Sequence, residues 1–251
     1  MTLDILDTVR SAFSRIASKA TLGVVGVTLA LLLIVGGLGI LAGALTSVSA
    51  VLGALVGLVA VAVYIAGAAS LTVGSMRAFD EKDFNKEMFT DNILWPFLRM
   101  TGANITTQAF VFMATYFILY PLLLVGIGGS VAMSAGASAA LSGATTAIMA
   151  VGGVIVAFIA LYVLSALLLA LPRIAVNDRR MFQALDESIQ ATSGERLRVI
   201  ATLLPFAVLI VTAFAGALRE GLVGYTIYGV SIFLSSFYML AILTELNSRL
   251  E

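Results

Sequence analysis

The chain contains neither histidine nor cysteine, so any chemistry would have to come from carboxylates, guanidinium groups, amines and hydroxyls. Histidine is the usual general base near neutral pH and the commonest metal ligand. Thiolates supply nucleophilic and metal-binding chemistry, and paired cysteines form disulfide frameworks. All of these are excluded by composition. We therefore expect no metal site and no cofactor in this protein.

The charged side chains that remain lie in a few clusters. There are 14 basic and 14 acidic residues, and none falls within residues 20–76, 100–172, 199–218 or 221–244. Proton relays, ion-coupled transport sites and voltage sensors need ionisable groups deep in a membrane helix, and this pattern leaves none there. Glu245 is the acid nearest to a helix interior, and we expect it to be solvated. We therefore expect no catalytic residue and no enzymatic activity.

The uncharged stretches have the length and composition of membrane helices. Hydrophobic residues make up 61% of the chain, above the roughly 45–50% of soluble domains, and one crossing needs about 20 apolar residues. The first two stretches suit two crossings each, and the last two suit one each. The first crossing is too long for a signal-peptide core, so we expect it to be retained. The pattern predicts an all-α membrane protein with six transmembrane helices, at residues 21–45, 48–74, 103–128, 145–171, 199–218 and 221–244.

Basic residues fall almost entirely on one side of the predicted membrane. Only Arg219 lies on the other side, so the positive-inside rule places both termini in the cytoplasm of a multi-pass plasma-membrane protein. The acids follow the bases, with Glu220 as the single exception. The inner face is therefore crowded with both signs and carries no net charge, which argues against a simple polybasic patch for anionic lipid.

Three segments on the predicted cytoplasmic side place apolar residues at helical spacing. They cover residues 3–18, 83–100 and 178–193, and each precedes one transmembrane hairpin. We expect Asp178 to be the N-cap of the third segment and Gly194 to end it. Such helices lie in the membrane interface, although packing on the protein would give the same pattern. The predicted architecture is a compact bundle of six transmembrane helices with three interfacial helices on its cytoplasmic face.

Small residues and prolines mark candidate packing and bending sites. Glycines at four-residue spacing let helix backbones approach closely, within this chain or between copies. A proline inside a helix removes one backbone hydrogen bond and kinks it. Residues 129–144 are rich in Gly, Ala and Ser, and either extend the helices outward or form a flexible loop. The candidate packing residues are Gly39, Gly43, Gly53 and Gly57, and the candidate kinks are Pro121 and Pro205.

One run of residues resembles a known family. It begins with Leu-Pro-Arg-Ile-Ala-Val-Asn-Asp at 171–178 and continues with Ala-Leu-Asp-Glu-Ser at 184–188 and Thr-Ser-Gly-Glu-Arg at 192–196. This run is similar to YciC-type prokaryotic membrane proteins, which are related to the membrane domain of some glycerophosphodiester phosphodiesterases. The resemblance carries no catalytic residue over. From the residues alone, we expect Pro172 to end the membrane helix and Ser188 to bond backbone or a neighbouring helix end.

Two functions are open at this point. The first is a non-enzymatic membrane protein that associates with membrane lipids or partner proteins through its cytoplasmic face. The second is a transporter or channel for a neutral or lipidic substrate, suggested by the prolines and by hydroxyl side chains along the third and sixth predicted helices. It predicts a continuous cavity at the bilayer midplane. The small-residue faces also permit a homo-oligomer, and no nucleic-acid partner is expected. The candidate lipid or partner contacts are Arg173, Arg179, Arg180, Arg196, Arg198 and Trp95.

Overall fold

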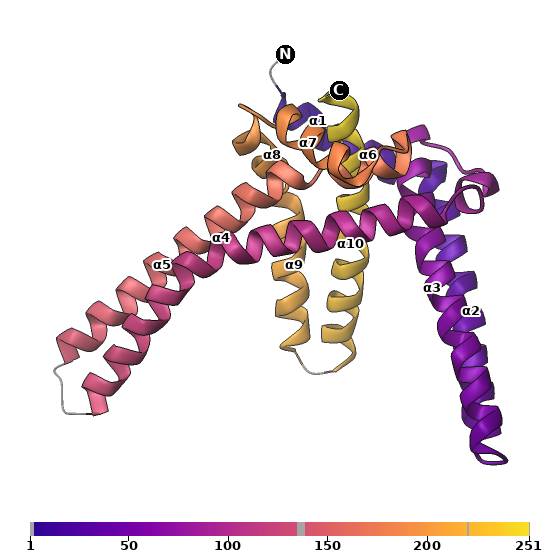
Figure 1. Cartoon of the computed structure of the whole chain (residues 1–251), viewed down its shortest axis with the longest axis horizontal. Helices are drawn as coiled ribbons and strands as arrows, with labels where there is room; N and C mark the ends of the chain where they lie inside the picture. Colours follow the sequence, from indigo (N-terminus) through magenta and orange to yellow (C-terminus); the bar gives the residue numbers. More distant parts are fainter. Residues whose placement is uncertain (1–2, 135–138, 220, 251) are drawn as a thin grey trace.

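The computed structural model describes residues 3–134, 139–219 and 221–250, and within these ranges it contains helices and no strand. Figure 1 shows long helical hairpins extending from one end of the molecule, where the shorter helices gather. The elements are α1 (Ile5–Ile16), α2 (Lys19–Thr46), α3 (Ala50–Glu81), the 3-10 turn η1 (Lys86–Phe89), α4 (Leu94–Ser134), α5 (Ala139–Leu167), α6 (Ala170–Asn177), α7 (Met181–Ala191), α8 (Arg196–Thr202), α9 (Leu204–Ala217) and α10 (Leu222–Arg249).

Four helical runs in the described residues are long and apolar enough to cross a membrane. They are α2, α3, the run Thr146–Asn177 and the run Val223–Arg249. A fifth is added if α8 and α9, which meet at an angle of 42°, count as one span. The all-helical membrane class is therefore confirmed, and the six crossings stay a prediction.

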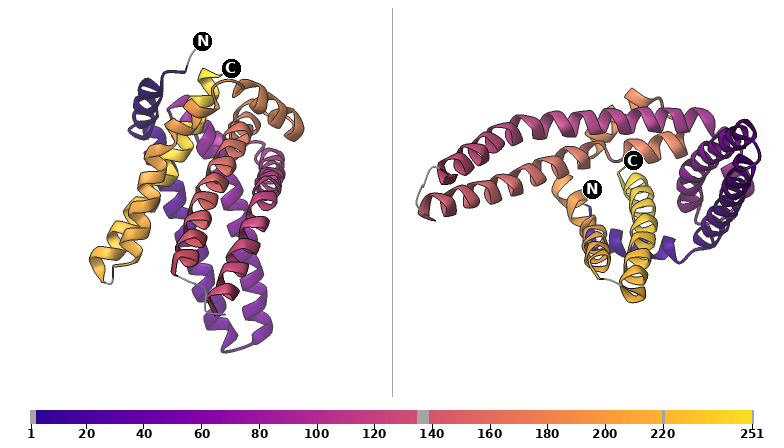
Figure 2. Two further views of the ribbon diagram at one scale, coloured as in Figure 1. Left: turned by 90° about the vertical axis from the view of Figure 1, so that its left-hand side faces the viewer. Right: turned by 90° about the horizontal axis from the view of Figure 1, so that it is seen from below.

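The hairpins splay apart, which contradicts the compact bundle predicted from the sequence. The closest helix pairs are α2 with α3, α4 with α5, and α9 with α10. The pairs converge at the end that carries α1, α6, α7 and α8 and separate toward the opposite end (Figures 1 and 2). In lipid there is no hydrophobic force between apolar helices. Uncharged faces therefore have no need to pack on one another, and hydropathy alone cannot predict which of them do.

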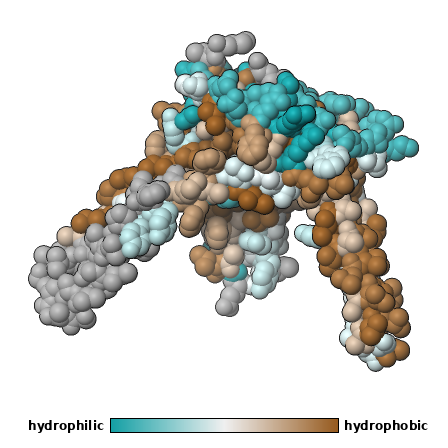
Figure 3. Space-filling view, viewed as in Figure 1, coloured by the Kyte–Doolittle hydropathy of each residue, from teal (hydrophilic) through white to brown (hydrophobic). Residues whose placement is uncertain are grey.

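The packed core lies at the end where the hairpins converge. Phe79 of α3, Ile174 of α6, and Tyr238 and Leu246 of α10 are fully buried there. In Figure 3 hydrophilic residues gather over this end, and hydrophobic residues dominate the α2–α3 hairpin. The charged layer and the packed core therefore share one end of the molecule, and this end fixes the hairpins relative to one another.

The segment predicted as one interfacial helix over 83–100 is two elements. Asn85 caps η1 by accepting the backbone N–H of Glu87 through its side-chain oxygen at 3.1 Å. Asn92 then adopts a left-handed backbone with φ 45°, which asparagine tolerates better than other residues with a Cβ. The chain turns there, and α4 begins at Leu94 and continues without a break through the span predicted at 103–128. The other two segments contain α1 and α7.

Asp178 ends α6 and does not N-cap α7, contrary to the prediction. Its backbone is left-handed, with φ 50°, and its N–H bonds the carbonyl of Arg173. The N–H of Arg179 bonds the same carbonyl at 3.3 Å, so the chain reverses as it does at left-handed helix ends. Arg180 takes the N-cap position of α7 and makes no side-chain cap bond. Gly194, with φ 84°, follows shortly after the end of α7.

Prolines accompany two breaks in the membrane helices. Pro172 lies inside α6 and does not end the membrane helix as predicted; the break comes earlier, between the end of α5 at Leu167 and the start of α6. A proline provides no N–H for the carbonyl four residues before it, which here belongs to Leu168. Pro205 is the second residue of α9, directly after the bend between α8 and α9. The side chain of Pro121, and the conformation of residues 135–138 within the outer segment 129–144, lie outside the described residues.

Close approach in the α2–α3 hairpin involves one of the expected glycines and one other. Of the four candidates, Gly53 alone is tight, because an added Cβ would collide with Thr46 in the α2–α3 hairpin. Nothing lies within 4 Å of a Cβ added at Gly39, Gly43 or Gly57, so a close contact at these three glycines stays a prediction. Gly67, which contacts Leu31, takes that role in the same hairpin.

Candidate functional site

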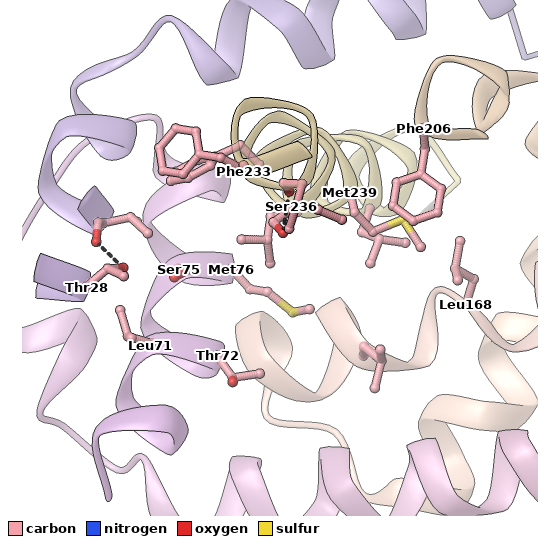
Figure 4. Close-up of a pocket in the computed structure, with 17 residues that line it drawn as sticks. Thr28, Leu71, Thr72, Ser75, Met76, Leu168, Phe206, Phe233, Ser236 and Met239 are labelled. Atoms are coloured by element: carbon pink, nitrogen blue, oxygen red, sulfur yellow. Dashed lines mark hydrogen bonds between the residues drawn. The ribbon is translucent and has the colours of Figure 1, made fainter. Parts of the chain in front are cut away.

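A cavity of about 780 Å³ separates the α2–α3 hairpin from the α9–α10 hairpin (Figure 4). Its volume falls within the roughly 300–1,000 Å³ typical of ligand pockets. Apolar side chains form most of its wall, among them Leu71, Leu168, Phe206 and Phe233. No Asp, Glu, Lys or Arg lines it. The space is therefore suited to an apolar ligand that enters from the membrane.

One face of α10 forms the longest wall of this cavity. Gly229, Ile232, Phe233, Ser236 and Leu240 line it at spacings of three and four residues, which places them on a single helical stripe. Gly229 leaves the stripe open near its outer end, since nothing lies within 4 Å of a Cβ added there. This wall extends from Gly229 towards the charged end of α10.

Three of the four hydroxyl side chains in the cavity wall are hydrogen-bonded to their own helices, and the fourth belongs to Ser75. Thr28 donates to the carbonyl of Val24 at 2.7 Å, and Thr72 donates to that of Ala68 at 2.7 Å. Ser236 donates to the carbonyl of Ile232 at 3.0 Å. Hydroxyls bonded in this way have used their one proton. They can accept a hydrogen bond from a ligand, but they provide no donors for an anion.

Arg15 fastens three helices together at the charged end. Its Nε donates to Glu245 Oε2 at 2.8 Å, and its Nη1 donates to the backbone carbonyls of Phe79 and Asp80. Both side chains of the Arg15–Glu245 pair are less than a tenth exposed, at 6% and 7%. The expectation that Glu245 is solvated was therefore wrong. This one guanidinium links α1 to both α3 and α10.

Glu245 is shared by a second arginine. Arg249 Nε donates to Glu245 Oε1 at 2.7 Å, and Arg249 Nη2 donates to Asp7 Oδ2 at 2.7 Å. The buried carboxylate is thus compensated by two guanidinium groups, as a buried charge requires. This arrangement is a structural ion cluster. In the residues that the structure describes, no three acidic side chains are grouped so that they could hold a metal ion.

A second, polar pocket of about 370 Å³ lies where α6 meets α7. It is lined by Arg173, Asn177, Arg179 and Glu187. Glu187 Oε2 lies 3.6 Å from Arg173 Nη1 and 3.6 Å from Arg179 Nε. Arg173 is almost buried, at 6% exposure. Two guanidinium groups therefore face one carboxylate around an open space.

The pocket is anchored to α10 through side-chain amides. Arg173 Nε donates to Asn247 Oδ1 at 3.2 Å, and Asn247 Nδ2 donates to Asn177 Oδ1 at 3.4 Å. From the other side, Ser188 Oγ donates to the carbonyl of Ala166 at 2.8 Å, which confirms the backbone bond predicted for that serine. The walls of the pocket are consequently held by α5, α6, α7 and α10 together.

The predicted contact residues do not form one site. Arg173 and Arg179 meet in the polar pocket, whereas Arg180 is exposed beside it. Arg196 lies over the ring of Tyr162, 4.8 Å from its centroid, and Arg198 is paired with Glu195 at 2.9 Å. Trp95 is 62% exposed at the start of α4, in a different region of the charged end.

Sequence reasoning missed Gly229, Glu187, Glu245 and Asn247. The stripe of Gly229 and Ser236 along α10 was a usable signal, because small residues at helical spacing mark an open or closely approached face. Nothing local marks Glu187 or Asn247, whose partners lie on other helices.

The region that holds the polar pocket and the α10 wall has a recognisable sequence. Residues 142–245 match the membrane domain of glycerophosphoryl diester phosphodiesterase. The relationship to that membrane domain is therefore shown for this range, and the YciC-type resemblance stays a prediction. The match to the membrane-domain family covers the α9 and α10 walls of the cavity and all four lining residues of the polar pocket, Arg173, Asn177, Arg179 and Glu187. Neither the curated proteins nor the solved structures include a match to this chain.

Proposed function

We propose that this protein is a non-enzymatic integral membrane protein that crosses the bilayer six times and binds a membrane lipid between its hairpins. The observation that carries the proposal is the apolar cavity of about 780 Å³ between the α2–α3 and α9–α10 hairpins. Its uncharged wall disfavours an ion, and the bonding of three of its four hydroxyls within their own helices disfavours a polar solute. An acyl chain is apolar and uncharged, and therefore matches this wall.

The depth of the cavity agrees with a lipid ligand. Its α10 wall extends from Gly229 to Leu243, which corresponds to about 21 Å at a rise of ~1.5 Å per residue. One leaflet contributes roughly half of the ~30 Å hydrocarbon core. A chain of one leaflet would therefore occupy about 15 Å of this wall, roughly two thirds of its length.

Two further observations support the six-crossing topology with cytoplasmic termini. α1 and the end of α10 are joined by the Arg249–Asp7 ion pair, so both ends of the described chain lie on one face. The hydrophilic layer covers the same face (Figure 3). Under the positive-inside rule this face is cytoplasmic.

The surface of α1 supports contact with lipid at this face. Phe13 is 50% exposed and its ring centroid lies 5.2 Å from that of Tyr238. Tyr238 is about two turns from Glu245 in the direction of the membrane. Leu6, 82% exposed, lies two turns before Phe13 on the same helical face. An interfacial helix presents its apolar face to the bilayer in this way.

The proposal is tested by closing the cavity with one side chain. Gly229→Phe places a ring in open space on the cavity wall, and Gly39→Phe, at an exposed position on α2 with equally open space, is the matched control. The assay is photocrosslinking in nanodiscs of a phospholipid with a diazirine in its acyl chain. We expect crosslinks at Met76 and Met239 of the cavity wall. Gly229→Phe should reduce them about tenfold, equivalent to ~1.4 kcal/mol. Equal crosslinking at these residues in both variants would refute the proposal.

Transport of a lipidic substrate is a second candidate. It is favoured by the 42° bend between α8 and α9 and by the position of the cavity between two hairpins, since a hairpin can move relative to its neighbour about such a bend. In vesicles with a headgroup-labelled fluorescent phospholipid, transport predicts faster exchange between leaflets than in protein-free vesicles, slowed again by Gly229→Phe. Exchange at the protein-free rate would reject transport and leave lipid binding standing.

A further inference from the structure

The polar pocket at the α6–α7 connection presents two cations at one point. Arg173 and Arg179 both approach Glu187, at 3.6 Å each. A direct charged hydrogen bond is about 2.7–2.9 Å long, so the Glu187 carboxylate forms no such bond with either guanidinium. Glu187 is instead held on its own helix, where its Oε1 accepts from Gln183 Nε2 at 2.9 Å. The four side chains that line the pocket therefore carry two positive charges and one negative charge, with open space beside the carboxylate.

The backbone brings the two arginines together. The left-handed residue Asp178 reverses the chain, and the N–H of Arg179 bonds the carbonyl of Arg173. Arg179 thus returns over the last turn of α6. Arg173 is oriented by Asn247 and is almost buried, whereas the side chain of Arg179 is 47% exposed. One guanidinium is fixed in place and the other can adjust to a ligand.

The same two helices, α6 and α10, contribute to both the polar pocket and the apolar cavity. On α6, Leu171 lines the cavity and Arg173 lines the pocket. On α10, Leu243 lines the cavity, and Asn247, which bonds Arg173, follows four residues later. Four residues correspond to about 6 Å along a helix. This is the order in which an amphiphile with an anionic headgroup would meet the protein from the membrane outward.

We propose that Arg173, Asn177, Arg179 and Glu187 form a binding site for a phosphate ester, carried as the headgroup of the lipid whose acyl chain occupies the cavity. This inference rests on the proposed lipid binding and adds the class of headgroup. Guanidinium groups bind phosphate oxygens through paired N–H donors. Asn177 supplies an amide to the same space. Glu187 opposes the anion and lowers the affinity of the site.

Because the pocket contains both cations and a carboxylate, removing one or the other should change the affinity for an anion in opposite directions. Arg179→Gln removes a cation and should weaken anionic binding, whereas Glu187→Gln removes the competing anion and should strengthen it. Arg180→Gln is the matched control, because Arg180 is the next residue, is exposed and does not line the pocket. Each variant is purified in full length and placed in nanodiscs whose phosphatidic acid and phosphatidylcholine have identical chains.

The measurement is the ratio of acyl-chain crosslinks formed by the two lipids at the cavity wall. We expect the unmodified chain and Arg180→Gln to prefer phosphatidic acid. Arg179→Gln should lower this preference about tenfold at unchanged total crosslinking, and Glu187→Gln should raise it. The preference should also weaken as salt is added. An unchanged preference in Arg179→Gln, or a lower one in Glu187→Gln, would overturn the inference.

Two further results distinguish a lipid from a free phosphate ester as the ligand. They also distinguish failure of the headgroup site from failure of the proposed function. Glycerol 3-phosphate is added as a soluble competitor. If it abolishes the preference at low concentration, a free phosphate ester is the ligand and the lipid source is overturned. If lipids crosslink in the cavity without headgroup preference, the headgroup site is wrong and lipid binding stands. If no crosslink forms in the cavity, the proposed function itself fails.

Discussion

At the scale of single residues, the charged end is held together by paired charged side chains, and removing one member of a pair destabilises the protein. Glu245 faces two guanidinium groups, and Arg15 also donates to carbonyls of α3. Removing one partner of a buried pair leaves an uncompensated charge, which costs more than the pair itself contributes. These side chains therefore secure α1 and α10 against α3, and changes there should act on stability.

Glu245→Ala is expected to destabilise the protein by about 3–5 kcal/mol, the usual cost of orphaning a buried charge. Glu195→Ala, which removes a surface pair with Arg198, should cost about 0–1 kcal/mol. Adding Arg15→Met to Glu245→Ala should cost less than the sum of the single changes, because it removes one of the two arginines left without the carboxylate. Thermal unfolding in one detergent checks these three variants together with the single change Arg15→Met. Strictly additive effects would contradict this account.

At the scale of elements, the connection between α6 and α7 decides where two arginines meet. Asp178 contributes a left-handed backbone and also pairs with Arg99 of α4 at 2.7 Å. The first contribution is local, and the second joins the α6–α7 connection to the start of α4. Because Asn tolerates the left-handed region and Ala does not, the two contributions can be separated by substitution.

Asp178→Asn should cost less than about 1 kcal/mol, since it removes one partly exposed ion pair and keeps the turn. Asp178→Ala should cost a further 1–2 kcal/mol or so, because its Cβ disfavours the left-handed backbone. Thermal unfolding in detergent measures both. If the alanine variant were as stable as the asparagine variant, the left-handed turn would not be a constraint on the connection.

At the scale of the whole molecule, three apolar hairpins are joined at one charged layer and separate away from it (Figure 2). Lipid can enter such an arrangement between the hairpins, which a compact bundle would prevent. The same arrangement requires that every hairpin turn lie on the side of the membrane opposite to the charged layer.

The chain has no native cysteine, so single cysteines report this topology without background. We expect Ser47→Cys, Ala144→Cys and Leu218→Cys, all exposed near the hairpin ends, to react with an impermeant maleimide outside intact cells. Thr90→Cys and Ser193→Cys, exposed at the charged end, should react only after the membrane is opened. Labelling of positions 47 and 90 from the same side would contradict the topology.

The sequence alone determined that this is a helical membrane protein with its charges gathered in clusters. A bilayer acts on each segment separately, so length and lack of charge are sufficient to identify a candidate span. The separation of the hairpins, the cavity and both arginine sites were decided only by tertiary structure. Arg15 and Glu245 are 230 residues apart, and no local spacing records such a partner. Apolar helices in lipid carry equally little information about their neighbours, because lipid contact and protein contact demand the same side chains.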